Sequence, residues 1–445
     1  MKTYLIIALV VIASVAAAWV GWRHFGRPQP KTAVIRNVVL ISIDTCRADR
    51  LSCYGYARPS TPHIDALAAE GVLFANALTP VPATTPAHSS MLTGSYPPTH
   101  GVRMNNGERL PDSNVTLAET LKKAGYRTGA FVGGFPVDAR FGLNQGFDTY
   151  DGQYTRQRFP DLPADERTAE EVSRPAMAWL DKNADKPFFL FLHYYDAHLP
   201  YAPPPPYAST FADDPYAGEI AYVDHWIGQV IDRLRAIGAY EDTLVIVTAD
   251  HGESLNEHNE TSHGYFMYQS TMHVPLVIRL PHARKGLKEE GNVSLVDIVP
   301  TVLDLAGLEP PSQVQGISLR GPLEGGALPD RTHPIYGESL WPATFDCGAL
   351  HGIVEGPWKY IRSPRQELYD LSQDLTEKNN LVDKEPKVAQ RLRERLERAL
   401  REGGPLRRQT RRPSRGSKAS GTWPAGRRPP VRPSTPNART PRTSS

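Results

Sequence analysis

Short apolar runs alternate with amphipathic segments from about residue 34 onward, and this alternation admits few folds. Apolar runs of this length are typical of strands that are buried on both faces, and the amphipathic segments are typical of helices that cover a sheet. The pattern therefore predicts an α/β fold with a large, mostly parallel central sheet flanked by helices. The candidate strands are Val34–Ile43, Thr128–Val132, Phe188–Tyr194, Thr243–Ala249 and Val274–Arg279.

Several predicted helices carry recognisable boundary signals. Thr116 and Thr168 are each followed three residues later by a glutamate, Glu119 and Glu171, which is the pattern of a capping box. A glycine that follows a segment with helical periodicity often marks the end of the helix. Three glycines fit this role: Gly71, Gly125 and Gly238.

The 445 residues, 40% hydrophobic and 22% charged, are ordinary for a globular protein and allow one large core or two unequal ones. We expect the main domain at residues 33–330. Residues 331–402 differ, because short strands near 335–339 and 358–361 precede a charged helix, and this indicates a smaller C-terminal α+β subdomain.

Residues Tyr4–Trp22 form an uninterrupted, uncharged apolar segment that is about long enough to cross a bilayer as a helix. Lys2 and the small residues at 16–18 suit a cleaved export signal, whereas the full apolar length suits an uncleaved anchor. We therefore read residues 1–32 as a signal peptide or membrane anchor plus linker. We expect export, with the protein anchored in the cell membrane or released to the periplasm or extracellular space.

The other end of the chain, residues 403–445, is rich in Pro, Ser, Thr and Arg and has no apolar period. Its Lys and Arg residues are not balanced by acids, so the rest of the chain is acidic. Such a composition cannot offset the entropy of ordering by burial, and it predicts a disordered basic tail. We expect a solvated tail and no nucleic-acid partner.

Two of the predicted strands end in acids. The run NVVLISIDT places Asp44 after its strand, and TLVIVTADHGES places Asp250 and His251 after another. A single aspartate there is more often a helix cap or turn former. However, ligand sites of open α/β sheets lie at the carboxyl ends of the strands, and two such ends with an imidazole favour a divalent metal ion. The imidazole favours Zn or Mn over Ca.

Further histidines follow strands. FLFLHYYDAHLPY supplies His193 and His198, and HNETSHGY supplies His258 and His263. We assign His258 a solvated or structural role because it lies in a polar loop. His198 and His263 are candidates for the site, since each lies in a short loop soon after a strand that ends there.

The stretch ATTPAHSSMLTG, residues 83–94, predicts a short helix that begins near Pro86 and ends near Gly94. On the residues alone, Thr84 or Thr85 is an N-cap. A helix N-terminus also binds sulfuryl or phosphoryl oxygens. A hydroxyl there, beside a cation, can be activated as a nucleophile, and both interpretations stay open.

These motifs, in this order, resemble the sulfatase branch of the alkaline phosphatase superfamily over roughly residues 36–382. The resemblance implies a large α/β domain, a small C-terminal domain built on a short sheet and a helix, and hydrolysis of anionic esters. The segments that carry it are NVVLISIDTCRADRLSCYGY, TTPAHSSMLTGSYPPTHGV, PFFLFLHYYDAHLPY, TLVIVTADHGESLNEH, VDIVPTVLDLAG and ELYDL.

The resemblance also implies roles for single residues. Asp44, Asp250 and His251 match positions that hold the catalytic metal. Thr84 matches the nucleophile, which itself contacts the metal.

Four further positions match the family pattern less directly. His198 and His263 match positions that contact the anionic group of the substrate, or a second metal in two-metal relatives. Asn105 matches a substrate-contacting asparagine, and His88 stands where the family has an arginine. We count Thr84, His88, His198 and His263 as candidate catalytic residues.

Three departures from the family pattern bear on the reaction. Sulfatases use C-x-P-S-R or S-x-P-S-R, whose first residue is oxidised to formylglycine, whereas this chain has Thr84-Thr85-Pro86-Ala87-His88. Threonine is not a known source of formylglycine. The Asp-Asp and Asp-Asn pairs of sulfatases are Asp44-Thr45 and Asp250-His251 here, and the family's Lys-x-His near Thr128 is absent. These changes resemble phosphoryl-transferring relatives that use a threonine nucleophile.

The leading hypothesis is thus a metal-dependent hydrolase of sulfuric or phosphoric esters that uses a threonine in place of formylglycine. Its substrate would be a small anionic ester or an anionic glycan or lipid. One alternative is a membrane-anchored transferase of phospho-headgroups in the cell envelope. The other is a non-catalytic binding protein with the sulfatase fold.

Overall fold

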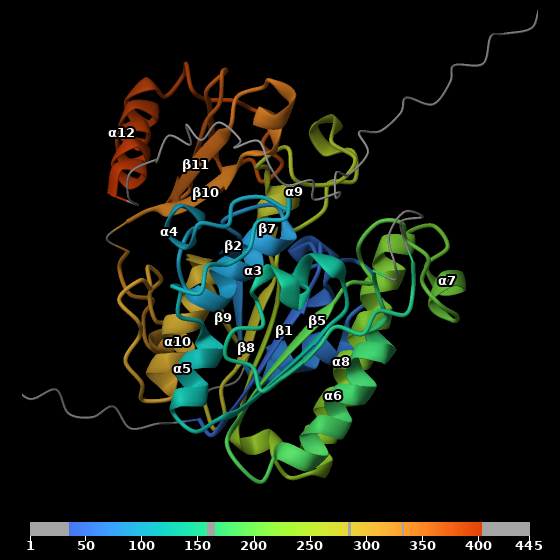
Figure 1. The fold of residues 1–445 in the computed structure, drawn as a ribbon. Helices are drawn as coiled ribbons and strands as arrows, with labels where there is room; N and C mark the ends of the chain where they lie inside the picture. Colours follow the sequence, from blue (N-terminus) through green and yellow to red (C-terminus); the bar gives the residue numbers. More distant parts are fainter. Residues whose placement is uncertain (1–34, 158–164, 284–285, 332, 403–445) are drawn as a thin grey trace, which may run out of the picture. The chain divides into compact units, whose positions relative to one another are not determined.

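The computed structural model describes residues 35–157, 165–283, 286–331 and 333–402 (Figure 1). The N-terminal segment 1–32 and the tail 403–445, for which a membrane or signal helix and disorder are predicted, lie outside the described residues. In the part of the chain that is described, no helix is both long and apolar enough to span a membrane.

The large sheet is built from nine described strands. They are β1 (Asn37–Ile43), β2 (Val72–Leu78), β3 (Arg127–Val132), β4 (Thr149–Asp151), β5 (Phe188–Tyr194), β6 (Thr243–Ala249), β7 (His273–Val274), β8 (Leu276–Arg279) and β9 (Leu287–Ser294). Their order is β4-β3-β5-β1-β6-β8-β2-β7, and β9 pairs with β2. The neighbours from β4 to β6 run parallel, whereas β8 is antiparallel to both β6 and β2. The prediction of a large, mostly parallel sheet is confirmed.

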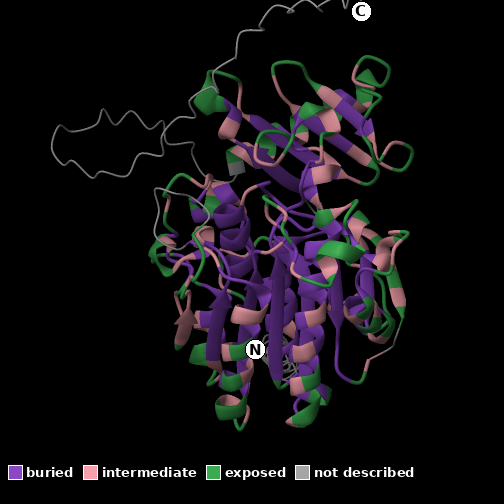
Figure 2. Ribbon diagram, turned by 90° about the vertical axis from the view of Figure 1, so that its right-hand side faces the viewer, coloured by how far each residue is buried: buried purple, intermediate pink, exposed green. Residues whose placement is uncertain are grey.

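The described helices are α2 (Pro62–Glu70), α3 (Thr84–Thr93), α4 (Pro97–His100), α5 (Leu117–Lys123), α6 (Ala169–Asn183), α7 (Tyr207–Thr210), α8 (Pro215–Ala236), α9 (Gln269–Met272), α10 (Ile298–Leu305), α11 (Arg320–Leu323) and α12 (Pro386–Glu402). Helix α8 contacts α2 and α6, and helices α3, α5 and α10 contact one another. Figure 1 shows α6 and α8 on one face of the sheet and α5 and α10 on the other. Figure 2 shows the strands buried between helices whose outer turns are exposed.

The predicted helix boundaries are confirmed. Both capping boxes form, at the start of α5 and of α6. Gly71 caps the end of α2, and Gly125 and Gly238 follow α5 and α8 with positive φ angles of 94° and 71°. The predicted strand 274–279 is divided into β7 and β8 at Pro275, which has no N–H to donate to a neighbouring strand.

Strands β1, β5 and β6 form the fully buried centre of the sheet. Strand β1 lies between the other two, and its last residue, Ile43, is in register with Tyr194 of β5 and Ala249 of β6. Because the three strands are parallel and end together, the residues that follow them meet at one edge of the sheet.

A second sheet, antiparallel and four-stranded, follows in the chain. Its strands β10 (Ile335–Ser339), β11 (Leu350–Glu355), β12 (Trp358–Arg362) and β13 (Glu367–Asp370) pair in chain order. Helix α12 packs Leu392 and Leu396 against Tyr336 and Tyr360 of this sheet. The expected C-terminal α+β arrangement is thus present, while the domain boundary at residue 330 stays a prediction.

The C-terminal sheet is hydrogen-bonded to two loops of the large domain, at Pro80 and at Arg103. The backbone N–H of Glu338 in β10 donates to the carbonyl of Pro80 at 2.9 Å. Its buried carboxylate accepts both Nε and one Nη of Arg103, the first at 2.7 Å. Arg103 is two residues from Asn105, one of the predicted site residues, so the loop 101–110 is held from the C-terminal side.

Candidate active site

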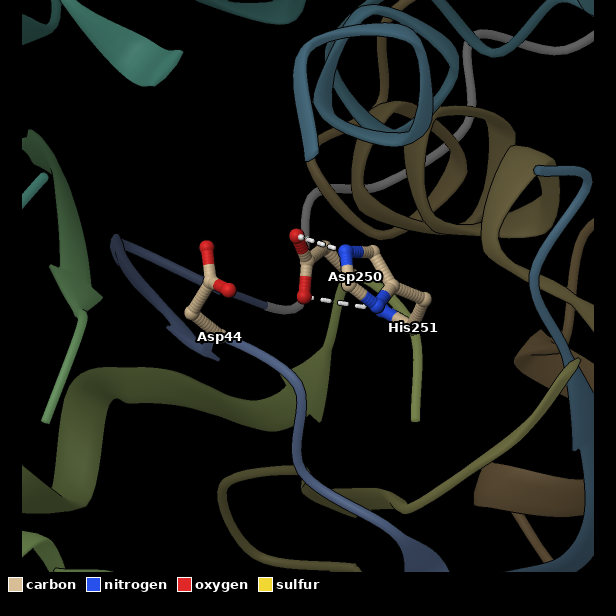
Figure 3. A group of neighbouring side chains, drawn as sticks. All are labelled: Asp44, Asp250 and His251. Atoms are coloured by element: carbon tan, nitrogen blue, oxygen red, sulfur yellow. Dashed lines mark hydrogen bonds and ion pairs between the residues drawn. The ribbon is translucent and has the colours of Figure 1, made fainter. Parts of the chain in front are cut away.

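Three predicted metal ligands meet at the carboxyl edge of the large sheet. Asp44 follows β1, and Asp250 and His251 follow β6. One ligand atom from each lies within 4.8 Å of the others, and all three residues are buried. Figure 3 shows the carboxylates of Asp44 and Asp250 side by side, although they come from different strands. The sequence prediction that these strand ends converge is confirmed geometrically.

The Asp250 carboxylate is fully buried, and only one of its oxygens is hydrogen-bonded. Oδ1 accepts the backbone N–H groups of His251 at 2.8 Å and Thr45 at 3.1 Å. Oδ2 has no hydrogen-bond partner among the described residues. Burial, together with the nearby charge of Asp44, raises the pKa of Asp250 well above its usual value. Two buried carboxylates with an orphaned oxygen fit a divalent cation.

The tautomer of His251 completes this donor set. Its Nδ1 lies 2.9 Å from the carbonyl oxygen of Gly252, and a carbonyl can only accept, so Nδ1 carries the proton. Burial, and then the proximity of His263, lowers the pKa of His251 well below its usual value, so the ring is neutral. Its Nε2 lone pair is therefore free to bind a metal, and it lies 3.4 Å from Oδ2 of Asp250.

A strained turn fixes the spacing between the two strand ends. Thr45 has a φ of 55°, in the left-handed region that β-branched residues avoid. Its hydroxyl donates to the carbonyl of Ala197 at 2.8 Å, and its carbonyl accepts the hydroxyl of Tyr216 at 2.6 Å. Because its N–H donates to Asp250, the turn after β1 is bound directly to the end of β6.

His193 orients the Asp44 carboxylate. Its Nε2 lies 3.0 Å from Oδ2 of Asp44, and burial and the nearby Arg167 lower the pKa of His193 to about 3, so the neutral ring donates Nε2–H. Sequence reasoning noted this histidine but did not select it. The register of β5 against β1, which pairs His193 with Ser42, was the signal that would have found it.

Thr84 is the first residue of α3, but it does not cap the helix. The N-cap is Ala83, which offers no side-chain cap. Asn105 supplies the acceptor instead, since its Oδ1 receives the N–H of Thr85 at 2.8 Å, and the Thr85 hydroxyl donates to the carbonyl of Pro136 at 2.7 Å. The N-cap interpretation of the two threonines is therefore wrong.

The Thr84 hydroxyl faces the metal-ligand cluster. Its Oγ1 lies 3.5 Å from Nε2 of His251, and the residue is only 1% exposed. With Asn105 capping the helix, the threonine oxygen is not used by the helix N–H groups. The hydroxyl oxygen therefore lies beside the nitrogen of His251 that would bind a cation.

His88 lies behind Thr84, fully buried. Its Nδ1 donates to the carbonyl of Thr84 at 2.8 Å, and its Nε2 accepts the hydroxyl of Ser42 at 3.0 Å. Burial and then His193 lower the pKa of His88 well below its usual value. These contacts support a role in fixing the first turn of α3 on β1, and the predicted catalytic role of His88 stays a prediction.

His263 lies next to His251, and His198 lies next to His263. The ring of His263 is 4.4 Å from that of His251 and 5.2 Å from that of His198. Nδ1 of His263 donates to Oε1 of Glu253 at 3.0 Å. Burial lowers the pKa of His263, but the Glu253 carboxylate outweighs it and raises this pKa to about 9. His263 is thus a cation at neutral pH, and Glu253 was missed by sequence reasoning although it follows His251 by two residues.

His198 is held in place by its neighbours. Its ring stacks on Tyr195 with centroids 4.6 Å apart, and its Nδ1 donates to the carbonyl of Leu199 at 2.8 Å. Of the other predicted residues, Thr84 and His263 lie next to His251, and His198 lies next to His263. Nδ1 of His88 lies 3.7 Å from Oδ2 of Asp250. Asn105 contacts the backbone of Thr85.

Comparison with known proteins identifies the class as hydrolases that act on ester bonds. Residues 36–308, more than half of the chain, match the family model described as Sulfatase. The protein belongs to the sulfatase family. Residues 261–402 match the model described as N-sulphoglucosamine sulphohydrolase, C-terminal, so the C-terminal sheet is part of the family pattern as well.

Two curated relatives from distant organisms have closely similar names. The chain is 26% identical to N-acetylgalactosamine-6-O-sulfatase of Bacteroides thetaiotaomicron over 81% of this chain and 92% of that protein. It is 29% identical to human N-acetylgalactosamine-6-sulfatase over 74% of this chain and 73% of that protein. Among solved structures, the phosphonate monoester hydrolase of Agrobacterium radiobacter superposes with a TM-score of 0.71 at 24% identity, covering 83% of this chain and 96% of that one. This last likeness is one of fold.

Proposed function

We propose that the protein is a metal-dependent hydrolase of phosphoric or sulfuric esters in which Thr84 is the nucleophile. One observation carries the proposal: Oγ1 of Thr84 lies 3.5 Å from Nε2 of His251, beside the buried carboxylates of Asp44 and Asp250. The set of two carboxylates, one imidazole and one hydroxyl suits Zn or Mn better than Ca.

In the proposed reaction, Oγ1 of Thr84 gives its proton to water and attacks the phosphorus or sulfur, and the bond to the leaving alcohol breaks. A bound divalent ion would lower the pKa of the hydroxyl and neutralise charge on the ester oxygens. His263, a cation beside Glu253, would donate a proton from Nε2 to the leaving oxygen. Water then hydrolyses the threonine ester, which returns Thr84 to its starting form.

The single hydroxyl of Thr84 favours phosphoric over sulfuric esters. Formylglycine hydrate can expel sulfate by forming an aldehyde, because it carries two hydroxyls on one carbon. Threonine carries one, so its ester must be cleaved by attack at phosphorus or sulfur. The names of the two curated relatives refer to sulfated hexosamines, and we therefore propose an anionic glycan ester as substrate. We also propose that the protein is exported.

The test is a comparison of substrates with the purified full chain. The protein is stripped with a chelator and reloaded with Zn or Mn, and turnover of 4-nitrophenyl sulfate, 4-nitrophenyl phosphate and bis(4-nitrophenyl) phosphate is measured. We expect metal-dependent turnover in which a phosphoric ester reacts faster than the sulfate. Turnover that is unaffected by chelation, or a preference for the sulfate, would contradict the proposal.

Glu253→Gln should shift the pH dependence of this activity. The substitution keeps the side-chain shape but removes the charge that raises the pKa of His263 to about 9. A group with a raised pKa is protonated below that value, so activity that needs the cation falls as pH rises through it. We expect the alkaline limb of kcat/KM to lie at lower pH in Glu253→Gln than in the unchanged protein.

The matched control for this shift is Glu257→Gln. Glu257 lies in the same loop but pairs with Arg47 at 2.7 Å, whereas the carboxylate that pairs with His263 is that of Glu253. Its substitution should leave the alkaline limb in place, and an equal shift in both variants would mean that Glu253 has no specific effect on His263.

A further inference from the structure

A buried ion pair lies where the C-terminal sheet meets helix α9. Nζ of Lys359 in β12 lies 2.7 Å from Oε1 of Glu377, and the two side chains are 3% and 1% exposed. Removing two charges from water costs about as much as their attraction returns, so a buried pair of this kind adds little net stability. The pair does restrict both side chains to one arrangement. Its effect is therefore to be sought in the groups that these side chains hold in place.

Glu377 has an unfavourable backbone conformation. Its φ is 53°, in the left-handed region that favours glycine. Strain of this kind persists only where surrounding contacts hold the residue in position. The loop after β13 is thus fixed at the residue that carries the buried carboxylate.

The second oxygen of this carboxylate holds α9. Oε2 of Glu377 accepts the backbone N–H of Gln269, the first residue of the helix. Nζ of Lys359 also donates to the side-chain oxygen of Gln269 at 3.4 Å. Tyr268, the residue before the helix, provides no side-chain cap. The first turn of α9 is therefore positioned by the C-terminal part of the chain.

Helix α9 in turn fixes the residue that follows the metal ligand His251. The N–H of Gly252 donates to the carbonyl of Thr271 in α9 at 2.8 Å. A Cβ atom at position 252 would lie 2.2 Å from the carbonyl oxygen of Ser270, so the helix approaches this position as closely as only glycine permits. The Gly252 carbonyl accepts Nδ1–H of His251 at 2.9 Å, which orients the ring and leaves Nε2 for the metal.

We propose that Glu377 is a positioning residue for the metal ligand His251. Glu377 fixes α9, α9 fixes Gly252, and Gly252 fixes the imidazole, while Lys359 keeps the Glu377 carboxylate in place. This inference rests on the metal site of the proposed function. Partners that orient metal ligands commonly change metal affinity by about 10- to 100-fold, and Glu377 acts at the lower end of this range because it acts through further contacts.

The test compares two double variants of the full chain that remove the same two charges. Glu377→Gln with Lys359→Met keeps an acceptor for the N–H of Gln269, whereas Glu377→Leu with Lys359→Met removes it. Each protein is stripped with a chelator, and its Kd for Zn is measured by competition with a chromophoric chelator. We expect the variant with Glu377→Leu to bind Zn about tenfold more weakly than the variant with Glu377→Gln, which should bind it as the unchanged protein does.

Denaturant unfolding of the metal-free proteins separates this effect from a loss of stability. A purely structural role would lower the free energy of unfolding of the variant with Glu377→Leu but leave the Kd for Zn equal in the two variants, and that result overturns the inference. If Glu377→Leu prevents folding, Glu377→Gly with Lys359→Met takes its place. Glycine suits the φ of 53° and likewise lacks the acceptor.

Ester turnover of the same preparations separates this inference from the proposed reaction. If Glu377→Leu weakens Zn binding but the unchanged protein hydrolyses no ester, the proposed reaction fails and the role of Glu377 stands. If esters are hydrolysed and the two variants bind Zn equally, only the role of Glu377 is overturned.

Discussion

Thr84→Ala should lower kcat for the best ester substrate by about 10³-fold or more, because it removes the oxygen that we propose forms the covalent ester. The fold should be preserved. The Thr84 hydroxyl does not cap α3, and the acceptor for the helix N–H comes from Asn105. Steady-state turnover and a thermal melt of the same preparation measure the two effects separately.

Two further substitutions serve as controls for the effect of Thr84→Ala. Thr84→Ser keeps a hydroxyl and should retain measurable turnover. Thr85→Ala removes the adjacent hydroxyl, which donates to the carbonyl of Pro136, and should cost far less activity than Thr84→Ala. If Thr84→Ala turns over substrate at the full rate, the nucleophile has been assigned to the wrong residue.

Asp250→Asn should abolish tight metal binding and make the metal-free protein more stable. The substitution removes the charge of a buried carboxylate whose Oδ2 has no hydrogen-bond partner among the described residues, so a cation is attracted less strongly there. Burial and the Asp44 charge raise the pKa of Asp250, which means that ionising it in the folded state is unfavourable. Without the metal, Asp250→Asn should therefore raise the free energy of unfolding at neutral pH by about 1 kcal/mol or more.

The measurements are metal content after dialysis and denaturant unfolding with chelator present. Asp224→Asn is the control, since Asp224 is another buried carboxylate but accepts the N–H groups of His63 and Ile64 instead of facing Asp44. It should leave metal content unchanged. Unaltered metal binding by Asp250→Asn would show that the cluster is not the metal site.

The strands that could be predicted were those buried on both faces. β1, β5 and β6 consist almost wholly of apolar residues, and their ends predicted where Asp44 and Asp250 would meet. β9, LKEEGNVS, was not predicted because it alternates half-buried with exposed positions and carries three charges. Its pairing with β2 depends on contacts that no local pattern records.

Sequence reasoning did not select His193 and Glu253, which act on other side chains of the site. His193 orients Asp44, and Glu253 charges His263, and neither role follows from spacing along the chain. The cap of α3 was misassigned for the same reason. Local preference favours a threonine, but Asn105, twenty residues away, provides the acceptor in the folded chain.

The ion pair between Arg103 and Glu338 has a consequence for exchanging segments between relatives. The loop 101–110 supplies the cap of the helix that begins with Thr84, yet the fully buried carboxylate that holds this loop belongs to the C-terminal sheet. A chimera that takes residues 331–402 from a relative without an acid at this position would leave the guanidinium of Arg103 without its partner. We therefore expect that the two segments must be exchanged together, although more than two hundred residues separate them in the chain.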